Sequence, residues 1–141
     1  MNIVAIVQAR MKSTRLPGKV MKLIDSNTPV IKVLLSRLSQ SKEIDKVVVA
    51  TSTNSVENPL VEYVTKLGYE VFLGSEHDVL DRYYKAAQWF SADVIVRITG
   101  DCPLIDPKIV DEIINMYKSK DIDYLSNTIT PTYPDGLDVE V

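Results

Sequence analysis

Residues 3–19 read IVAIVQARMKSTRLPGK, and this stretch decides both the fold and the place of a candidate site. It begins with five consecutive apolar residues, 3–7, a pattern typical of a parallel strand that is buried on both faces. Four cations follow with no acidic residue among them: Arg10, Lys12, Arg15 and Lys19. The stretch therefore predicts a buried strand whose carboxyl end carries a strongly basic loop.

Three more apolar runs predict further strands, at 47–50, 70–73 and 94–98. Between and after them, apolar residues recur at helical spacing in four segments: 30–38, 60–67, 79–87 and 110–117. Strands that alternate with helices predict βαβ units and an α/β fold. We expect a three-layer, Rossmann-like arrangement in which helices flank a mostly parallel sheet.

Capping residues mark the ends of these helices. The first helix is predicted to have Thr28 as its N-cap and Pro29 at its first position. The second is expected to start at Asn54 or Ser55, and Asp78 and Asp106 are expected to cap the third and fourth. Gly68 stands where a helix favours glycine after its last residue.

The last part of the chain is less regular. Residues 123–125 are predicted to form a short strand, and 137–141 alternate as a strand does. A strand at the extreme end, with no closing element, predicts that the natural chain continues. We therefore expect residues 1–141 to be one α/β domain that is truncated at its C-terminus.

Composition narrows the function classes. The net charge of −3 disfavours a nucleic-acid-binding domain, which is usually basic. The single cysteine, Cys102, leaves no intrachain disulfide and no paired-cysteine metal site. The longest apolar runs are far shorter than the roughly 20 residues of a membrane span, and the N-terminus lacks the order of a signal peptide. We expect a cytoplasmic protein without membrane or nucleic-acid partners.

The basic loop has a predicted neighbour. Open α/β sheets bind ligands where the strand order reverses. We assume that the four predicted strands lie side by side in the order third, second, first, fourth. The basic loop then meets the loop after the fourth strand, TGDCPLID, which carries Asp101. Cations suit a polyphosphate, and one carboxylate suits Mg²⁺ that is shared with phosphate oxygens. The alternative is a solvated basic loop beside an ordinary turn.

Two common phosphate motifs are absent. A Walker A loop has serine or threonine after its Gly-Lys pair, but here Val20 follows Gly18-Lys19. The dinucleotide-binding motif GxGxxG does not occur in the chain. A P-loop kinase and a dinucleotide dehydrogenase are therefore disfavoured.

With these loops in view, the chain resembles a known family. The stretches VQARMKSTRLPGK and RITGDCPLIDP are similar to those of the cytidylyltransferases that activate acidic sugars, such as CMP-keto-deoxy-octulosonate and CMP-sialic acid synthetases. HDVLDRYYKAA and DGLDVEV narrow the resemblance to the branch of spore-coat polysaccharide biosynthesis proteins. The resemblance spans nearly the whole chain and implies a nucleotide-diphospho-sugar-transferase fold.

The resemblance also implies an activity and its residues. CTP would be the donor, Mg²⁺ the cofactor, a sugar the acceptor, and a homodimer the form of the longer protein. Arg15 and Lys19 would stabilise the leaving pyrophosphate, and Asp101 would hold the metal, with Asp138 and Glu140 as weaker second ligands. The nucleotide would contact a set of eight residues: Ala9, Arg10, Ser13, Arg15, Lys19, Val79, Leu80 and Arg82.

Two alternatives stay open. One is another nucleotide-sugar enzyme on the same fold, either a nucleotidyltransferase with another base preference or a glycosyltransferase. The other is a nucleotide-binding module without catalysis. Base preference and pyrophosphate release separate these readings.

Overall fold

The protein is described here by a computed structural model of residues 1–141. Four parallel strands form one sheet: β1 (Ile3–Gln8), β2 (Lys46–Ser52), β3 (Glu70–Gly74) and β4 (Val94–Thr99). Their order in the sheet is β3-β2-β1-β4. The α/β class expected from the sequence is confirmed. The strand order is the one that was assumed for the placement of the site, and it reverses between β1 and β4.

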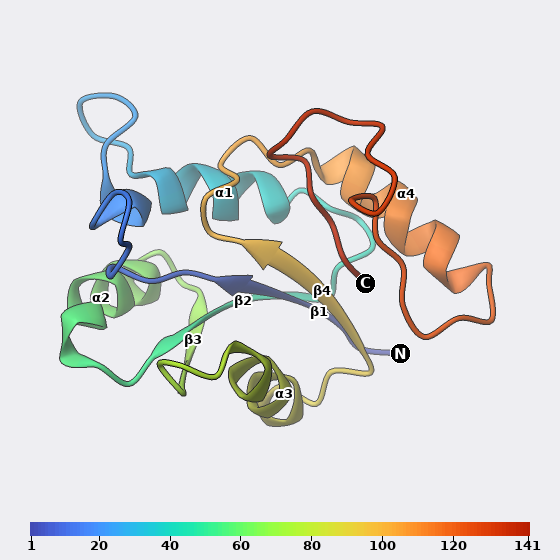
Figure 1. Cartoon of the computed structure of the whole chain (residues 1–141), viewed down its shortest axis with the longest axis horizontal. Helices are drawn as coiled ribbons and strands as arrows, with labels where there is room; N and C mark the ends of the chain where they lie inside the picture. Colours follow the sequence, from blue (N-terminus) through green and yellow to red (C-terminus); the bar gives the residue numbers. More distant parts are fainter.

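Helices cover both faces of the sheet and give three layers (Figure 1). The chain has four α-helices and two 3₁₀ turns: α1 (Val30–Leu38), α2 (Asn58–Lys66), α3 (Val79–Trp89), α4 (Pro107–Lys118), η1 (Lys19–Met21) and η2 (Ser55–Glu57). Apolar residues of α1, α2 and α4 pack together on one face, and α3 packs alone on the other. None of these helices combines the length and the apolar character needed to cross a membrane.

Strand β1 forms the centre of the core. Ile3, Ala5 and Val7 belong to the larger apolar cluster under α1, α2 and α4, whereas Val4 and Ile6 belong to the smaller cluster against α3. All five side chains are buried. The continuous apolar run at the N-terminus thus reflects a strand covered on both faces.

The predicted caps of α3 and α4 are confirmed, whereas the predicted starts of α1 and α2 are not. Helix α2 begins at Asn58, after the 3₁₀ turn, with Glu57 as its N-cap. Asp78 accepts a hydrogen bond from the Asp81 N–H at 2.9 Å, and Asp106 accepts one from the Lys108 N–H at 2.8 Å. Asn54 caps the 3₁₀ turn that leads into α2, and Gly68, at φ +91°, follows the end of α2.

The prediction for the start of α1 is wrong by one residue. Pro29, and not Thr28, is the N-cap, with an extended backbone at ψ 151°. The reason is a local pairing that fixes Pro29 outside the helix: Leu23 and Pro29 form an antiparallel bridge, and the Val30 N–H donates to the Lys22 carbonyl at 2.9 Å.

The two strands predicted near the C-terminus are not formed. Instead, Glu140 forms two isolated antiparallel bridges, one with Arg97 of β4 and one with Ser126, the residue that follows 123–125. Leu125 and Val141 exchange backbone hydrogen bonds of 2.9 and 2.8 Å. The extended conformation is therefore present, but each pairing is too short to form a ladder.

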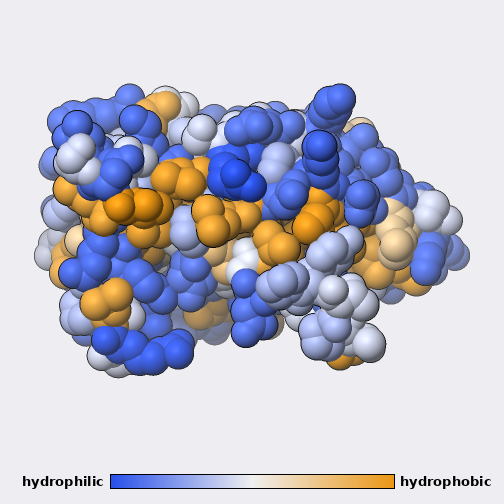
Figure 2. Space-filling model, turned by 90° about the horizontal axis from the view of Figure 1, so that it is seen from above, coloured by the Kyte–Doolittle hydropathy of each residue, from blue (hydrophilic) through white to orange (hydrophobic).

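One face of the molecule mixes hydrophobic and hydrophilic side chains. Viewed from above, hydrophobic side chains form a broken band between hydrophilic regions (Figure 2). The exposed large hydrophobic residues of the chain include Leu23, Ile24 and Leu104, with 57, 54 and 66% of their surface exposed. Single exposed apolar side chains of this kind are normal on protein surfaces.

Stability should fall at alkaline pH because of Tyr83, which is 6% exposed between α3 and the sheet. Burial raises the pKa of its phenol from 10.0 to about 12, although the nearby Arg97 guanidinium opposes the shift. Between pH 10 and 12 the unfolded chain loses this proton and the folded protein keeps it. The free energy of unfolding should therefore fall with rising pH, by roughly 2–3 kcal/mol from this group.

Urea denaturation at pH 9 and pH 11.5 tests this expectation. The Tyr83→Phe variant lacks the ionisable group and should lose less stability than the wild type over this interval. Equal losses in the two proteins would contradict the assignment.

Candidate functional site

The carboxyl ends of β1 and β4 enclose a polar cavity of about 240 Å³. We call it the basic cavity; its lining comprises Gln8, Ala9, Arg10, Ser13, Arg15, Lys19, Val20, Arg97, Thr99, Gly100 and Asp101. Six residues named from the sequence lie together here: Ala9, Arg10, Ser13, Arg15, Lys19 and Asp101. The reversal of strand order brings their two loops to one place.

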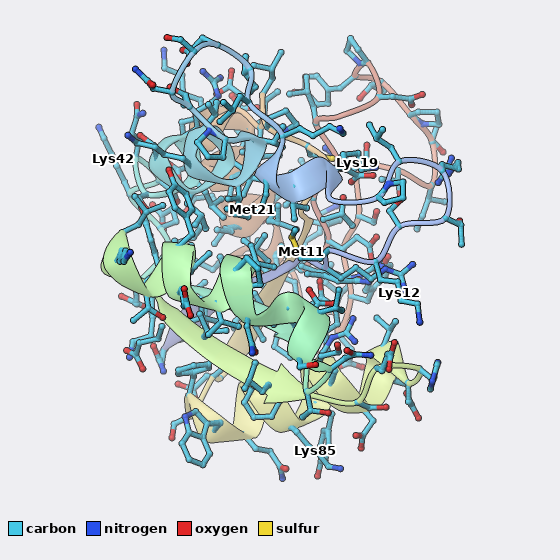
Figure 3. All side chains as sticks on the ribbon, turned by 90° about the vertical axis from the view of Figure 1, so that its left-hand side faces the viewer. Met11, Lys12, Lys19, Met21, Lys42 and Lys85 are labelled. Carbon is cyan, nitrogen blue, oxygen red and sulfur yellow. The ribbon has the colours of Figure 1, made fainter.

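The basic loop folds back on itself, and we call the contact between Met11 and Gly18, where its two ends meet, the neck of the loop. The Gly18 N–H donates to the Met11 carbonyl at 2.7 Å, which closes the loop over residues 12–17. Gly18 has φ +69°, a conformation that favours glycine. The Ser13 hydroxyl accepts from the Leu16 N–H at 3.3 Å within the loop. In Figure 3, Lys12 and Lys19 lie on one side of the molecule and Lys42 lies on the opposite side.

Lys19 and Asp101 join the two loops by an ion pair of 3.2 Å between Nζ and Oδ2. Burial by itself raises the pKa of the Asp101 carboxyl, but hydrogen bonds from Thr99 and Lys19 outweigh it, so the pKa lies below 3.8. The contribution of Asp101 to stability is therefore present above pH 3.8 and is lost as the pH falls through the lowered pKa. Asp101 is ionised at neutral pH.

The donor set fits a metal that is shared with a ligand, not one enclosed by protein. No group of three or more His, Cys, Asp or Glu side chains could hold a metal ion. Asp101 is the one carboxylate in the lining of the basic cavity, and 45% of its side chain is exposed. One ionised carboxylate beside cations fits Mg²⁺, which usually takes one or two carboxylates together with phosphate oxygens and water.

The two weaker metal candidates do not line this cavity. Glu140 forms a 2.6 Å ion pair with Arg97 and accepts a 3.2 Å hydrogen bond from the Tyr124 hydroxyl. Asp138 is exposed, and its charge acts on the thiol of Cys102, next to Asp101. Burial raises the pKa of the Cys102 thiol, and the carboxylates beside it raise the pKa further, so the thiol is protonated at neutral pH.

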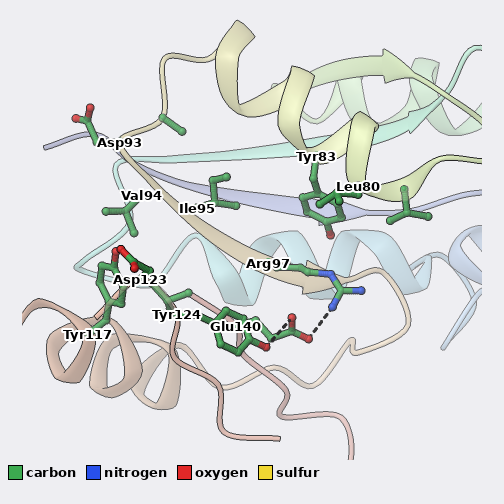
Figure 4. A pocket seen from close by; sticks show the side chains of 13 residues that line it. Leu80, Tyr83, Asp93, Val94, Ile95, Arg97, Tyr117, Asp123, Tyr124 and Glu140 are labelled. Carbon is green, nitrogen blue, oxygen red and sulfur yellow. Dashed lines mark hydrogen bonds and ion pairs between the residues drawn. The ribbon is translucent and has the colours of Figure 1, made fainter. Parts of the chain in front are cut away.

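A larger cavity of about 600 Å³ lies along the outer edge of β4, with a mostly hydrophobic lining (Figure 4). Val79 and Leu80, two residues that the resemblance places near the nucleotide, line this cavity and not the basic one. Arg97 lines both cavities, and its charge is paired with Glu140. The larger cavity therefore has no free cation for a phosphate, and the basic cavity is the better anion site.

Arg82, the third such residue, lies in neither cavity lining. It is 2% exposed, and its Nη1 donates to the Ser75 carbonyl at 2.6 Å. Burial lowers the pKa of its guanidinium from 12.5. A Cβ on Gly74 would come within 2.9 Å of the Arg82 Cγ, so Arg82 packs tightly against the end of β3.

The sequence reasoning missed five residues of the lining: Gln8, Val20, Arg97, Thr99 and Gly100. A signal existed for Arg97, which interrupts the apolar run of β4 with a charge. A signal also existed for Gly100, which directly follows the strand. Neither feature of the sequence predicts which other part of the chain Arg97 or Gly100 contacts in the fold.

Gly100 allows the two loops to approach each other. A Cβ at this position would meet the Gln8 carbonyl oxygen at 2.7 Å and the Ala9 Cβ at 3.0 Å. Gly100→Ala should therefore destabilise the fold by about 1–3 kcal/mol and widen the cavity, with weaker binding of inorganic tripolyphosphate. Thermal denaturation and calorimetry measure the two effects.

Gly68→Ala is the control, because Gly68 has a positive φ and no neighbour within 4 Å. This variant should lose stability and keep its tripolyphosphate affinity. If Gly100→Ala also kept wild-type affinity, the close approach would not shape the cavity.

A family model described as cytidylyltransferase matches residues 4–135, a range that includes both loops of the basic cavity. The chain belongs to the cytidylyltransferase family. The resemblance stated from the sequence is thereby confirmed.

Individual relatives support the same family assignment. The chain is 41% identical over 127 residues to the spore coat polysaccharide biosynthesis protein SpsF of Bacillus subtilis, covering 87% of this chain and 52% of that protein. The chain spans about half the length of the curated relatives that it matches.

Solved structures show the same fold. A cytidylyltransferase from Leptospira borgpetersenii superposes with a TM-score of 0.94 at 39% identity, covering 99% of this chain and 59% of the other. A CMP-2-keto-3-deoxy-manno-octonic acid synthetase in complex with CTP gives a TM-score of 0.77 at 25% identity, covering 89% and 52%. The expected nucleotidyltransferase-like fold is therefore confirmed.

Proposed function

We propose that this protein is a sugar nucleotidyltransferase, which transfers CMP from CTP to an acidic sugar and releases pyrophosphate, in the biosynthesis of a surface or spore-coat polysaccharide. The observation that carries the proposal is the basic cavity, where Arg10, Arg15 and Lys19 lie together with one ionised carboxylate, Asp101. Membership of the cytidylyltransferase family and a structural relative described with CTP support the choice of nucleotide.

In this proposal the cations of the basic loop bind the triphosphate. Arginine binds phosphate oxygens in pairs, and lysine supplies a compact charge. A sugar hydroxyl attacks the α-phosphorus and loses its proton to solvent, the bond from that phosphorus to the bridging oxygen breaks, and pyrophosphate leaves with the released negative charge. Arg15 and Lys19 stabilise this charge, which is the main task of a protein in phosphoryl-type transfer.

Asp101 is the residue that would hold Mg²⁺ in this cavity, and the bound ion would neutralise phosphate charge. Asp101 pairs with Lys19 at 3.2 Å. Ligand binding must therefore redistribute this pair, so that Lys19 faces phosphate oxygens.

The apolar cavity is the proposed place for Val79 and Leu80 to contact less polar parts of the substrates. Arg97 connects it to the basic cavity. Arg82 is assigned an indirect role, since its burial against Gly74 and Ser75 keeps it from the lining of either cavity.

Pyrophosphate release tests the proposal. The protein is incubated with Mg²⁺, one nucleoside triphosphate and 3-deoxy-manno-octulosonate or a sialic acid, and released pyrophosphate is quantified. The proposal predicts release with CTP that requires the sugar. Release with another triphosphate would support the alternative nucleotidyltransferase, and tight CTP binding without release would support a binding module.

A further inference from the structure

A buried carboxylate outside the basic cavity holds the neck of the basic loop. Glu57, the last residue of η2, is 2% exposed. Its Oε2 accepts a hydrogen bond from the Met11 N–H at 2.7 Å, across 46 positions of sequence. Its Oε1 accepts one from the Ser52 hydroxyl at 3.4 Å, at the end of β2. Glu57 thus connects the first loop to the end of the neighbouring strand.

Both backbone polar groups of Met11 are used at this neck. Its N–H donates to Glu57, and its carbonyl accepts from Gly18 at 2.7 Å. The last contact of this segment with the sheet is the hydrogen bond from the Ala9 N–H to the Ala50 carbonyl at 3.3 Å. The direction in which the chain enters the basic cavity after Ala9 therefore depends on the position of Met11.

The charges around Glu57 favour a fixed carboxylate. A carboxylate that leaves water is costly unless it is paired and hydrogen-bonded. Both carboxylate oxygens of Glu57 accept a hydrogen bond, one from the Met11 N–H and one from the Ser52 hydroxyl. Arg82, which is also buried, adds an electrostatic attraction to Glu57 without forming an ion pair with it.

A second tether to the loop is weaker. Lys12 Nζ lies 3.5 Å from Glu76 Oε1, and 70% of the lysine side chain is exposed. Exposed ion pairs of this kind contribute little. The Asn54 amide donates to both oxygens of Glu76, so Glu76 is itself held in place. The tether from Met11 to Glu57 is the buried one of the two.

We propose that Glu57 is a positioning residue for phosphate binding: its carboxylate fixes the backbone of Met11 and so sets how Arg10, Ser13 and Arg15 enter the basic cavity. The inference rests on the proposed function in one respect, since that function names the phosphates that the positioned loop binds. A hydrogen bond from a backbone N–H to a carboxylate is among the stronger ones in proteins. The length of the Glu57 side chain, which brings the acceptor oxygen to the Met11 N–H, positions the loop, and not the charge of the carboxylate alone.

Two variants separate reach from charge. Glu57→Gln keeps the length of the side chain and an acceptor oxygen but loses the charge. Glu57→Asp keeps the charge but withdraws the acceptor by one methylene, beyond the 2.7 Å contact with Met11. Glu62→Gln, on the exposed face of α2, is the matched control. The readouts are the exchange rate of the Met11 amide, by NMR, and the affinity for inorganic tripolyphosphate, by calorimetry.

Positioning predicts that Glu57→Asp raises the Met11 exchange rate and lowers tripolyphosphate affinity, each by about tenfold. Glu57→Gln should stay within about threefold of wild type in both, because the neutral acceptor still bonds to Met11. The amide of Ile6 in β1 should keep its protection in both variants, which separates loop release from global unfolding.

The proposal is overturned if Glu57→Asp binds tripolyphosphate as well as Glu57→Gln does, or if folded Glu57→Asp keeps wild-type affinity. It is also overturned if the wild type binds no tripolyphosphate. Failure of the proposed function looks different: the wild type would bind tripolyphosphate with the predicted dependence on Glu57 and would still release no pyrophosphate from CTP and a sugar.

Discussion

Asp101→Asn should lower sugar-dependent pyrophosphate release from CTP by about a thousandfold, the largest effect that we expect from a single substitution. Asp101 is the one carboxylate in the lining of the basic cavity, and asparagine retains its size without its charge. Binding of CTP should also become insensitive to Mg²⁺. Steady-state rates and calorimetric titrations, each with and without Mg²⁺, measure these effects.

The same variant should change metal-free binding in the opposite direction. Loss of the carboxylate releases Lys19 from its 3.2 Å ion pair and removes a negative charge from a cationic cavity. Tripolyphosphate without Mg²⁺ should therefore bind Asp101→Asn more tightly than wild type. Asp121→Asn, at an exposed position, should change neither property. Unchanged Mg²⁺ dependence in Asp101→Asn would contradict the role assigned to Asp101.

Arg15→Ala should weaken CTP binding by about 10- to 100-fold, since a bond between charged groups at a phosphate is lost. Arg15 lines the basic cavity and belongs to no ion pair of the protein, so its charge is available to a ligand. Arg15→Lys keeps the charge but not the planar fork and should bind with intermediate affinity.

Calorimetry on the two Arg15 variants measures this effect, with Lys32→Ala as the control at an exposed lysine outside the cavity. If CTP binding depended only on the net charge of the protein, Arg15→Ala and Lys32→Ala would lower the affinity equally. Equal losses would therefore show that binding depends on net charge and not on the geometry of the cavity.

The features predicted correctly from sequence are those that depend on local pattern. The apolar run of β1 is continuous because both faces of the strand are covered, and Asp78 and Asp106 cap their helices through hydrogen bonds two or three residues away. The meeting of the two loops of the site was predicted only on an assumed strand order, together with the rule that ligands bind where the order reverses. The structure has that order, and Lys19 and Asp101, 82 positions apart, form an ion pair between the two loops.

The features that sequence missed depend on contacts distant in the chain. Glu57 lies in an unremarkable polar stretch, and its role exists only through the contact with Met11, 46 positions away. The motif around α3 indicates a segment but not the direction of each side chain, so Leu80 is 80% exposed whereas Arg82 is buried. At α1, a bridge to Leu23 overrides the preference of proline for the first helical position.

The central claim is that the basic cavity binds a cytidine triphosphate. Calorimetric titration of the wild type with CTP, UTP, ATP and GTP in the presence of Mg²⁺, repeated with Arg15→Ala, tests it most directly. The account predicts selective binding of CTP that is weakened by Arg15→Ala. Absence of triphosphate binding by the folded wild type, or equal CTP binding by both proteins, would contradict it.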